Sequence, residues 1–105
     1  MRRGEVWDAI LPEPAGPRPV LILSHDSMPA ARPEITVAYL TTRRRYSRAE
    51  VPPTAAGDGV ERDCVVNLDS INTVSKDFLV GRVCKLSAAR MQEVADAIRF
   101  ALNLP

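Results

Sequence analysis

Hydrophobic and polar residues form short, regular runs along most of this chain. The run from Arg18 to Asp26 has a charged start, a block of valine, leucine and isoleucine, and a polar end. The run from Ile35 to Thr42 is rich in β-branched residues and closes on two threonines. Residues of this kind, bounded by turn-forming residues, predict strands that are buried on at least one face.

Further short runs predict a mainly β protein. Residues 5–11 alternate between apolar and polar through Asp8, as on a half-buried strand. Residues 61–69, which we expect to end at Asp69, and residues 80–86 also read as strands. Residues 49–59 contain tandem prolines, which fit a short edge strand and a turn but not a central strand.

A single helix is predicted to close the chain. Ser87 is a favourable N-cap, and an apolar stripe follows it at helical spacing. The stripe consists of Met91, Val94, Ala95, Ile98, Ala101 and Leu102. Ser75 is expected to cap a short turn through residues 76–79. Several short strands followed by one helix predict a single domain over residues 1–105, a small β-barrel or curled sheet with the helix packed on it.

Arg18 and Thr41 are the first candidates for a functional site. Pro19 restricts Arg18 to an extended conformation, so the strand begins with a fixed arginine. If the two strands pair antiparallel, the start of one lies beside the end of the other. Arg18 and Thr41 would then converge on one ligand.

Composition narrows the class of protein. Hydrophobic residues make up 46% of the chain, which is typical of a globular protein. No apolar run approaches the length of about 20 residues that a membrane span needs, and the first residues lack the apolar stretch of a signal peptide. We therefore expect a cytoplasmic location and no membrane partner.

The charge of the chain leaves nucleic-acid binding open. A net charge of +1 argues against a strongly basic nucleic-acid binder but not against a local basic face. Of the 14 cationic residues, 12 are arginine, whose planar guanidinium suits phosphate. Genomic base composition would give the same bias, and both explanations stay open.

A cluster of cations follows directly on Thr42. This segment, residues 43–48, is here called the basic lip, and its candidate residues are Arg43, Arg44, Arg45, Tyr46 and Arg48. One interpretation is a solvated loop of like charges. The other is a phosphate-facing surface in which the tyrosine stacks on a base.

Other kinds of catalytic site have little support. The chain lacks a glycine-rich phosphate loop, a metal-ligand cluster and a Gly-x-Ser-x-Gly motif, so we expect no cofactor and no metal. His25 is the only histidine, which excludes a two-histidine acid–base mechanism within one chain. Cys64 and Cys84 lie in apolar contexts and are expected to be free, buried thiols and not zinc ligands or nucleophiles.

Four segments in this order resemble the MazF/PemK family of toxin endoribonucleases. They are residues 3–7, 18–26, 37–42, and 61–69 with 71–74. The resemblance implies an SH3-like β-barrel of the CcdB/PemK type that acts as a homodimer. It also implies metal-independent cleavage of single-stranded RNA at short sequence motifs, with mRNA, rRNA or tRNA as targets, which inhibits translation and growth. The implied partner is a MazE-like antitoxin whose acidic tail occupies the RNA groove of this type II toxin.

The resemblance also implies roles for individual residues. Arg18 and Thr41 match the catalytic arginine and threonine of the family, and Asp69 matches an aspartate that is catalytic in the Kid branch. Asn67 stands where that branch has a catalytic arginine, so it is assigned to RNA binding together with Thr42 and the basic lip. In attack by a 2′-hydroxyl on the adjacent phosphorus, Arg18 would hold phosphate oxygens and Thr41 would donate a hydrogen bond. Asp69 would orient Arg18 or accept the proton.

Two alternatives from other classes remain. CcdB-type toxins share the fold but bind DNA gyrase and cut nothing, and they use a C-terminal tryptophan region that residues 103–105 lack. A non-catalytic RNA-binding module is the second alternative, because SH3-like barrels serve many roles. The pairing of Arg18 with Thr41 favours the nuclease. The sequence departs from many relatives in a short proline-rich loop, residues 12–17, and in His25, which replaces an asparagine.

Overall fold

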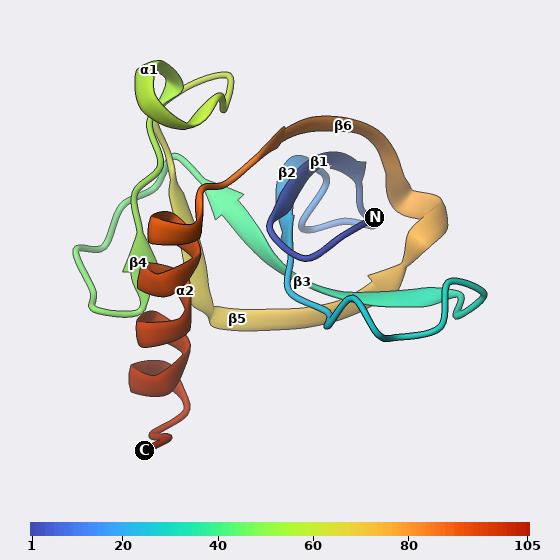
Figure 1. Ribbon diagram of the computed structural model, residues 1–105. Helices are drawn as coiled ribbons and strands as arrows, with labels where there is room; N and C mark the ends of the chain where they lie inside the picture. Colours follow the sequence, from blue (N-terminus) through green and yellow to red (C-terminus); the bar gives the residue numbers. More distant parts are fainter.

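The computed structural model describes residues 1–105 as one strongly curled antiparallel sheet with a helix at its side (Figure 1). The strands are β1 (Glu5–Ile10), β2 (Pro17–Ile22), β3 (Glu34–Thr41), β4 (Glu50–Val51), β5 (Val65–Ser75) and β6 (Leu79–Lys85). The helices are α1 (Ala55–Asp58), the 3-10 helix η1 (Lys76–Phe78) and α2 (Ala88–Ala101). The strand order is β4-β5-β3-β2-β1-β6, and all neighbours are antiparallel. The predicted mainly β fold with a C-terminal helix is confirmed.

The central strands β2 and β3 are buried on both faces. Leu21 pairs with Ala38 and faces the core that α2 covers, while Val20 pairs with Tyr39 on the opposite face. That opposite face forms a second core, which Leu79 at the start of β6 helps to close. Burial on two sides explains why β2 reads as a continuous apolar run and not as an alternating one.

The longest strand, β5, corrects one prediction. The sequence suggested a strand over residues 61–69 that ends at Asp69, but β5 starts at Val65 and continues to Ser75. Its pairing with β3 shifts register between Ala38 and Tyr39, which leaves residues 68–70 as a bulge. A bulge bends the strand and increases its twist, so the polar residues that suggested an end mark a bend instead.

The helix α2 lies beside β4 and the first half of β5 (Figure 1). Its predicted cap is confirmed, because the Ser87 hydroxyl accepts a hydrogen bond of 3.1 Å from the Arg90 amide. Val94 and Ala97 are its buried residues. The predicted stripe is wrong at Leu102, which follows the last helical residue and is 55% exposed. No helix of this protein has the length and apolarity that a membrane crossing requires.

Candidate active site

Arg18 lies near the start of β2, opposite Ala9 of β1, and is half-buried. Its Nε donates a hydrogen bond of 2.9 Å to the Ala15 carbonyl, and its Cζ lies 5.6 Å from the centroid of the Tyr39 ring. None of the ion pairs in the protein includes Arg18. The guanidinium is therefore held in place by a carbonyl and a ring, while its terminal nitrogens remain available to an anion.

Thr41 is the last residue of β3 and is also half-buried. Its Oγ1 accepts a hydrogen bond of 3.1 Å from the Arg43 amide. A hydroxyl that already accepts still has one hydrogen to donate. Because β2 and β3 pair antiparallel, the start of β2 lies beside the end of β3. Arg18 and Thr41 accordingly line the same pocket, whose volume is about 460 Å³.

The pocket has apolar walls with three further charged residues. Its apolar lining comes from β1, β3, β6 and the segment that precedes β5. The charged residues are Asp8, Glu61 and Arg62, and sequence reasoning missed all three. Glu61 and Arg62 were assigned to a strand, whereas they lie in an exposed turn between the buried Val60 and β5. For Glu61 and Arg62 the only available signal was a run of three charged residues, 61–63, between apolar ones.

Arg18 also borders a second, broader hollow of about 780 Å³. This hollow is lined by polar residues of the second half of β5, among them Asn72 and Thr73, and by Glu34 and Tyr39 of β3. Arg18 is thus the residue that both hollows share. An extended ligand that fills both would pass directly over its guanidinium.

Asp69 and Asn67 lie apart from this position. Asp69 is exposed on the bulge of β5, where its amide donates a hydrogen bond of 3.0 Å to Asn67 Oδ1. Asn67 pairs with Tyr39 on one side and Glu50 on the other. Neither Asp69 nor Asn67 lines a hollow that Arg18 borders. The structure therefore places Arg18 and Thr41 in one pocket, whereas Asp69 and Asn67 line neither hollow.

The basic lip is an exposed loop with a defined conformation. The Glu50 carboxylate accepts hydrogen bonds from the amides of Arg45, at 2.9 Å, and Ser47, at 3.2 Å. The Arg44 guanidinium lies 4.8 Å from the centroid of the Tyr46 ring, which is 81% exposed. The other predicted RNA-binding residues lie in different surroundings. Thr42 lines the 460 Å³ pocket, Arg43 is exposed, and Arg48 lies 4.4 Å from the centroid of the Phe100 ring on α2.

The cysteines and the histidine form no nucleophilic pair. Cys64 and Cys84 are free and half-buried, a little more open than expected. Burial raises the pKa of both thiols, so they stay protonated at neutral pH. His25 is exposed in the loop after β2 and lines neither hollow at Arg18. No group of three or more His, Cys, Asp or Glu side chains is arranged to hold a metal ion.

Comparison with known proteins identifies the family. The model of the PemK-like, MazF-like toxins of type II toxin–antitoxin systems matches residues 2–102. The chain is 39% identical over 99 residues to the probable endoribonuclease MazF2 of Mycobacterium tuberculosis, covering 94% of this chain and 95% of that protein.

Solved structures agree with this match. An endoribonuclease from a mycobacterial species, solved with its cognate antitoxin, has a TM-score of 0.86 and 28% identity, covering 100% of this chain and 97% of that one. The Mycobacterium tuberculosis toxin MazF-mt6 has a TM-score of 0.86 and 31% identity, covering 96% and 98%. The resemblance and the CcdB/PemK-type fold expected from the sequence are confirmed. This chain belongs to the PemK-like, MazF-like family of toxins of type II toxin–antitoxin systems.

Proposed function

We propose that this chain is the toxin of a type II toxin–antitoxin system and a metal-independent, sequence-specific endoribonuclease of single-stranded RNA. The observation that carries the proposal is Arg18, a half-buried cation without an ion-pair partner, beside the Thr41 hydroxyl and between two hollows. Relatives that are endoribonucleases support it. The gyrase-binding and non-catalytic alternatives are not favoured.

In the proposed reaction the RNA supplies its own nucleophile. The 2′-hydroxyl attacks the adjacent phosphorus, the new 2′-oxygen–phosphorus bond forms, and the bond to the 5′-oxygen breaks. The products are a 2′,3′-cyclic phosphate and a free 5′-hydroxyl. Negative charge builds up on the phosphoryl oxygens during attack, and preorganised donors at those oxygens lower the barrier. Arg18 supplies two such donors and Thr41 supplies a third.

Two protons must also move. A base accepts the proton of the 2′-hydroxyl, and an acid protonates the leaving 5′-oxygen. Arginine stays protonated in proteins, so Arg18 is unsuited to give up or accept a proton and we assign it to charge stabilisation. Asp69 forms no ion pair with Arg18, so the expected role of orienting that residue is not assigned to it. We keep Asp69 as the candidate base. Because it sits on the bulge, it takes part only if the RNA crosses β5 on its way from Arg18.

The RNA is proposed to run from the Arg18 pocket onto the basic lip. Thr42 lines that pocket, and the exposed arginines follow it directly. Arginines beside an exposed tyrosine form a surface that binds phosphates and stacks bases. The lip is held by its backbone at Glu50, so its side chains remain available for nucleotides that flank the cut.

We further propose that the chain acts in the cytoplasm as a single-domain homodimer and that a cognate MazE-like antitoxin inhibits it. Cleavage of mRNA, and of rRNA or tRNA where they are accessible, would inhibit translation and growth. An acidic antitoxin tail would compete with RNA phosphates for Arg18 and the basic lip. The mycobacterial endoribonuclease solved with its antitoxin supports the existence of such a partner.

The test is incubation of the purified protein with a long RNA in excess EDTA. We expect cuts at a small number of discrete sites, which primer extension will map. Arg18→Ala protein, with an unchanged thermal melt, should lose this cleavage by roughly 10²-fold or more. Asp69→Asn should be slower if Asp69 accepts the proton. Wild-type cleavage by folded Arg18→Ala protein would refute the assignment of the site.

A further inference from the structure

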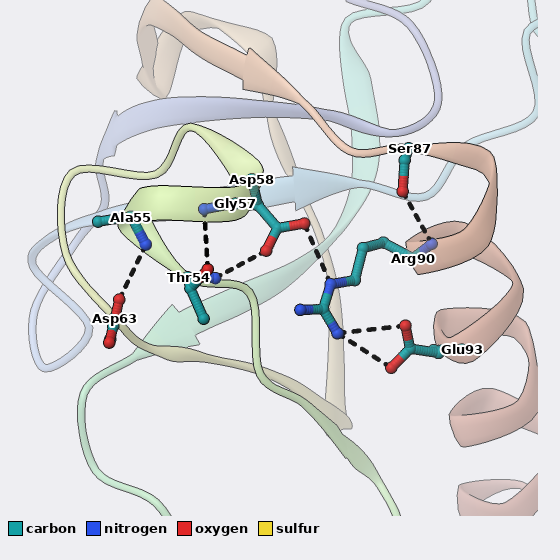
Figure 2. A network of polar contacts seen from close by, with 8 residues as sticks. All are labelled: Thr54, Ala55, Gly57, Asp58, Asp63, Ser87, Arg90 and Glu93. Atoms are coloured by element: carbon teal, nitrogen blue, oxygen red, sulfur yellow. Dashed lines mark hydrogen bonds and ion pairs between the residues drawn. The ribbon is translucent and has the colours of Figure 1, made fainter.

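The segment that precedes β5 is closed on itself by hydrogen bonds between its two ends. Figure 2 shows this segment, residues 54–63, with α1 at its centre. The Asp63 carboxylate accepts a hydrogen bond of 2.8 Å from the Ala55 amide, and Thr54 Oγ1 accepts one of 3.0 Å from Gly57. The Thr54 amide in turn donates to Asp58 at 2.8 Å. The segment is therefore held together by hydrogen bonds from its backbone amides to its own side chains.

A partly buried ion pair links this segment to α2. Arg90 Nε donates to Asp58 Oδ1 at 3.0 Å, and the exposed fractions of these side chains are 26% and 7%. Burial opposes the charged form of Asp58, but the bonds from Thr54 and Arg90 outweigh it, so the pKa of this carboxyl lies below its ordinary value. Arg90 is itself fixed by Glu93 at 3.1 Å, as Figure 2 shows. Asp58, at 7% exposed, is the least exposed side chain in any ion pair of the protein.

A third contact packs the segment against β6. Gly59 has a φ of 87°, and a Cβ at this position would lie 3.1 Å from Cys84 Cβ. A side chain here would crowd Cys84, and the positive φ favours glycine, so the backbone lies close against β6 at this point. Val60 follows at once and is 6% exposed in the core under α2. The residues on either side of Glu61 and Arg62 are thus anchored, Val60 by burial and Asp63 by its hydrogen bond to Ala55.

The next two residues, Glu61 and Arg62, are not part of this packing. Glu61 and Arg62 are exposed, form no ion pair, and line the pocket that contains Arg18 and Thr41. Arg62 adds a second unpaired arginine to that pocket. A side chain that ends in a planar donor group can bind a phosphate or the Hoogsteen edge of a base.

We propose that Arg62 contacts the RNA in this pocket and that Arg90, through Asp58, is a positioning residue for it. The inference rests on the proposed function and extends it to a residue pair that determines substrate affinity. Arg90 lies on α2 and does not line the pocket, so it acts only by holding the segment that carries Arg62.

A double-mutant cycle tests this coupling. The probe is an RNA oligonucleotide that spans a mapped cut, with 2′-deoxyribose at the cut position so that binding is measured without cleavage. Fluorescence anisotropy gives the dissociation constant for wild type, Arg62→Ala, Arg90→Ala and the double variant. Arg99→Ala is the matched control, because Arg99 pairs with Asp96 on the exposed face of the same helix at 3.1 Å.

We expect Arg62→Ala to weaken binding by roughly 10-fold or more, the usual effect of losing a hydrogen bond from a charged group. Arg90→Ala should weaken it by a similar or smaller factor, and the double variant should match Arg62→Ala within about twofold. Arg99→Ala should bind as wild type does. Asp58→Asn, which retains an acceptor for Thr54, provides a second and milder break of the same pair.

Three results would overturn the inference. The first is unchanged binding by Arg62→Ala. The second is wild-type binding by folded Arg90→Ala protein, as expected if Arg90 served stability alone. The third is a double variant in which the two losses multiply, as expected if Arg90 acted independently of Arg62. These results are distinct from failure of the proposed function, which would appear as cleavage by Arg18→Ala at the wild-type rate. Thermal melts of every variant ensure that binding is measured on folded protein.

Discussion

Thr41→Val is the sharpest perturbation of the proposed site. Valine has nearly the shape of threonine and is equally suited to a strand, so the change removes a hydroxyl and little else. In the folded protein that hydroxyl accepts one partly exposed hydrogen bond from the Arg43 amide. Its loss should cost about 0.5–1 kcal/mol of unfolding free energy, too little to unfold a domain of this size.

The effect on catalysis should be much larger. A preorganised donor to a developing oxyanion typically contributes about 10²-fold or more to kcat, which corresponds to roughly 2.7 kcal/mol of activation free energy. We therefore expect kcat to fall by about 10²-fold while KM changes by only a few-fold, because the donor acts mainly in the transition state. Thr41→Ser, which keeps the hydroxyl, should recover most of the rate.

The assay is steady-state cleavage of a fluorescent RNA that contains a mapped cut. Thr36→Val is the matched control, because Thr36 lies on the same strand and lines neither hollow at Arg18, and its hydroxyl bonds to Thr73 at 2.9 Å. A folded Thr41→Val protein that cleaves within threefold of wild type would refute the role assigned to this hydroxyl.

The remaining predictions concern the basic lip and acid stability. Replacing Arg44 and Arg45 by alanine should weaken RNA binding and reduce the slope of the log binding constant against log salt concentration by about 0.7 per lost phosphate contact. The value of kcat should change little. An unchanged slope would favour a merely solvated loop. Tyr46→Ala should cost about 1–3 kcal/mol of binding if the ring stacks on a base. Burial opposes ionisation of Glu5 and Asp58, yet hydrogen bonds and cations lower both pKa values below the ordinary 4.5 and 3.8. The two carboxylates therefore contribute their full stability when the pH is above the ordinary pKa values. They lose it as the pH falls through the lowered pKa values of the folded protein. Chemical denaturation should show a steeper acid loss in wild type than in a Glu5→Gln variant; equal pH profiles would contradict this.

Much of the fold followed from local patterns. Alternation and β-branched runs placed β1, β2 and β3, and Ser87 marked the start of α2. Polar residues at the bulge hid the continuation of β5, because a bend and an end have the same local composition. The glycines and prolines of residues 49–59 suggested a short edge strand and a turn; β4 confirms the strand, but α1 was not predicted.

The site was predictable to the extent that pairing determines it. Antiparallel pairing of β2 with β3 was enough to predict that Arg18 and Thr41 line the same pocket. The role that we propose for Arg62 was not predictable, because the proposal rests on the contact between Asp58 and Arg90, which lie 32 residues apart in the sequence. No local pattern reveals such a pair, since an ion pair leaves no periodicity in the chain.

The central claim is that RNA is cut by its own 2′-hydroxyl at the Arg18 and Thr41 site. It is tested most directly by the ends that wild-type protein leaves on a defined RNA oligonucleotide in excess EDTA, read by mass spectrometry. We expect a 2′,3′-cyclic phosphate and a 5′-hydroxyl, and no cleavage when the ribose at the cut carries 2′-hydrogen. A 5′-phosphate product, cleavage of the 2′-deoxy substrate, or activity only on addition of Mg²⁺ would contradict the account.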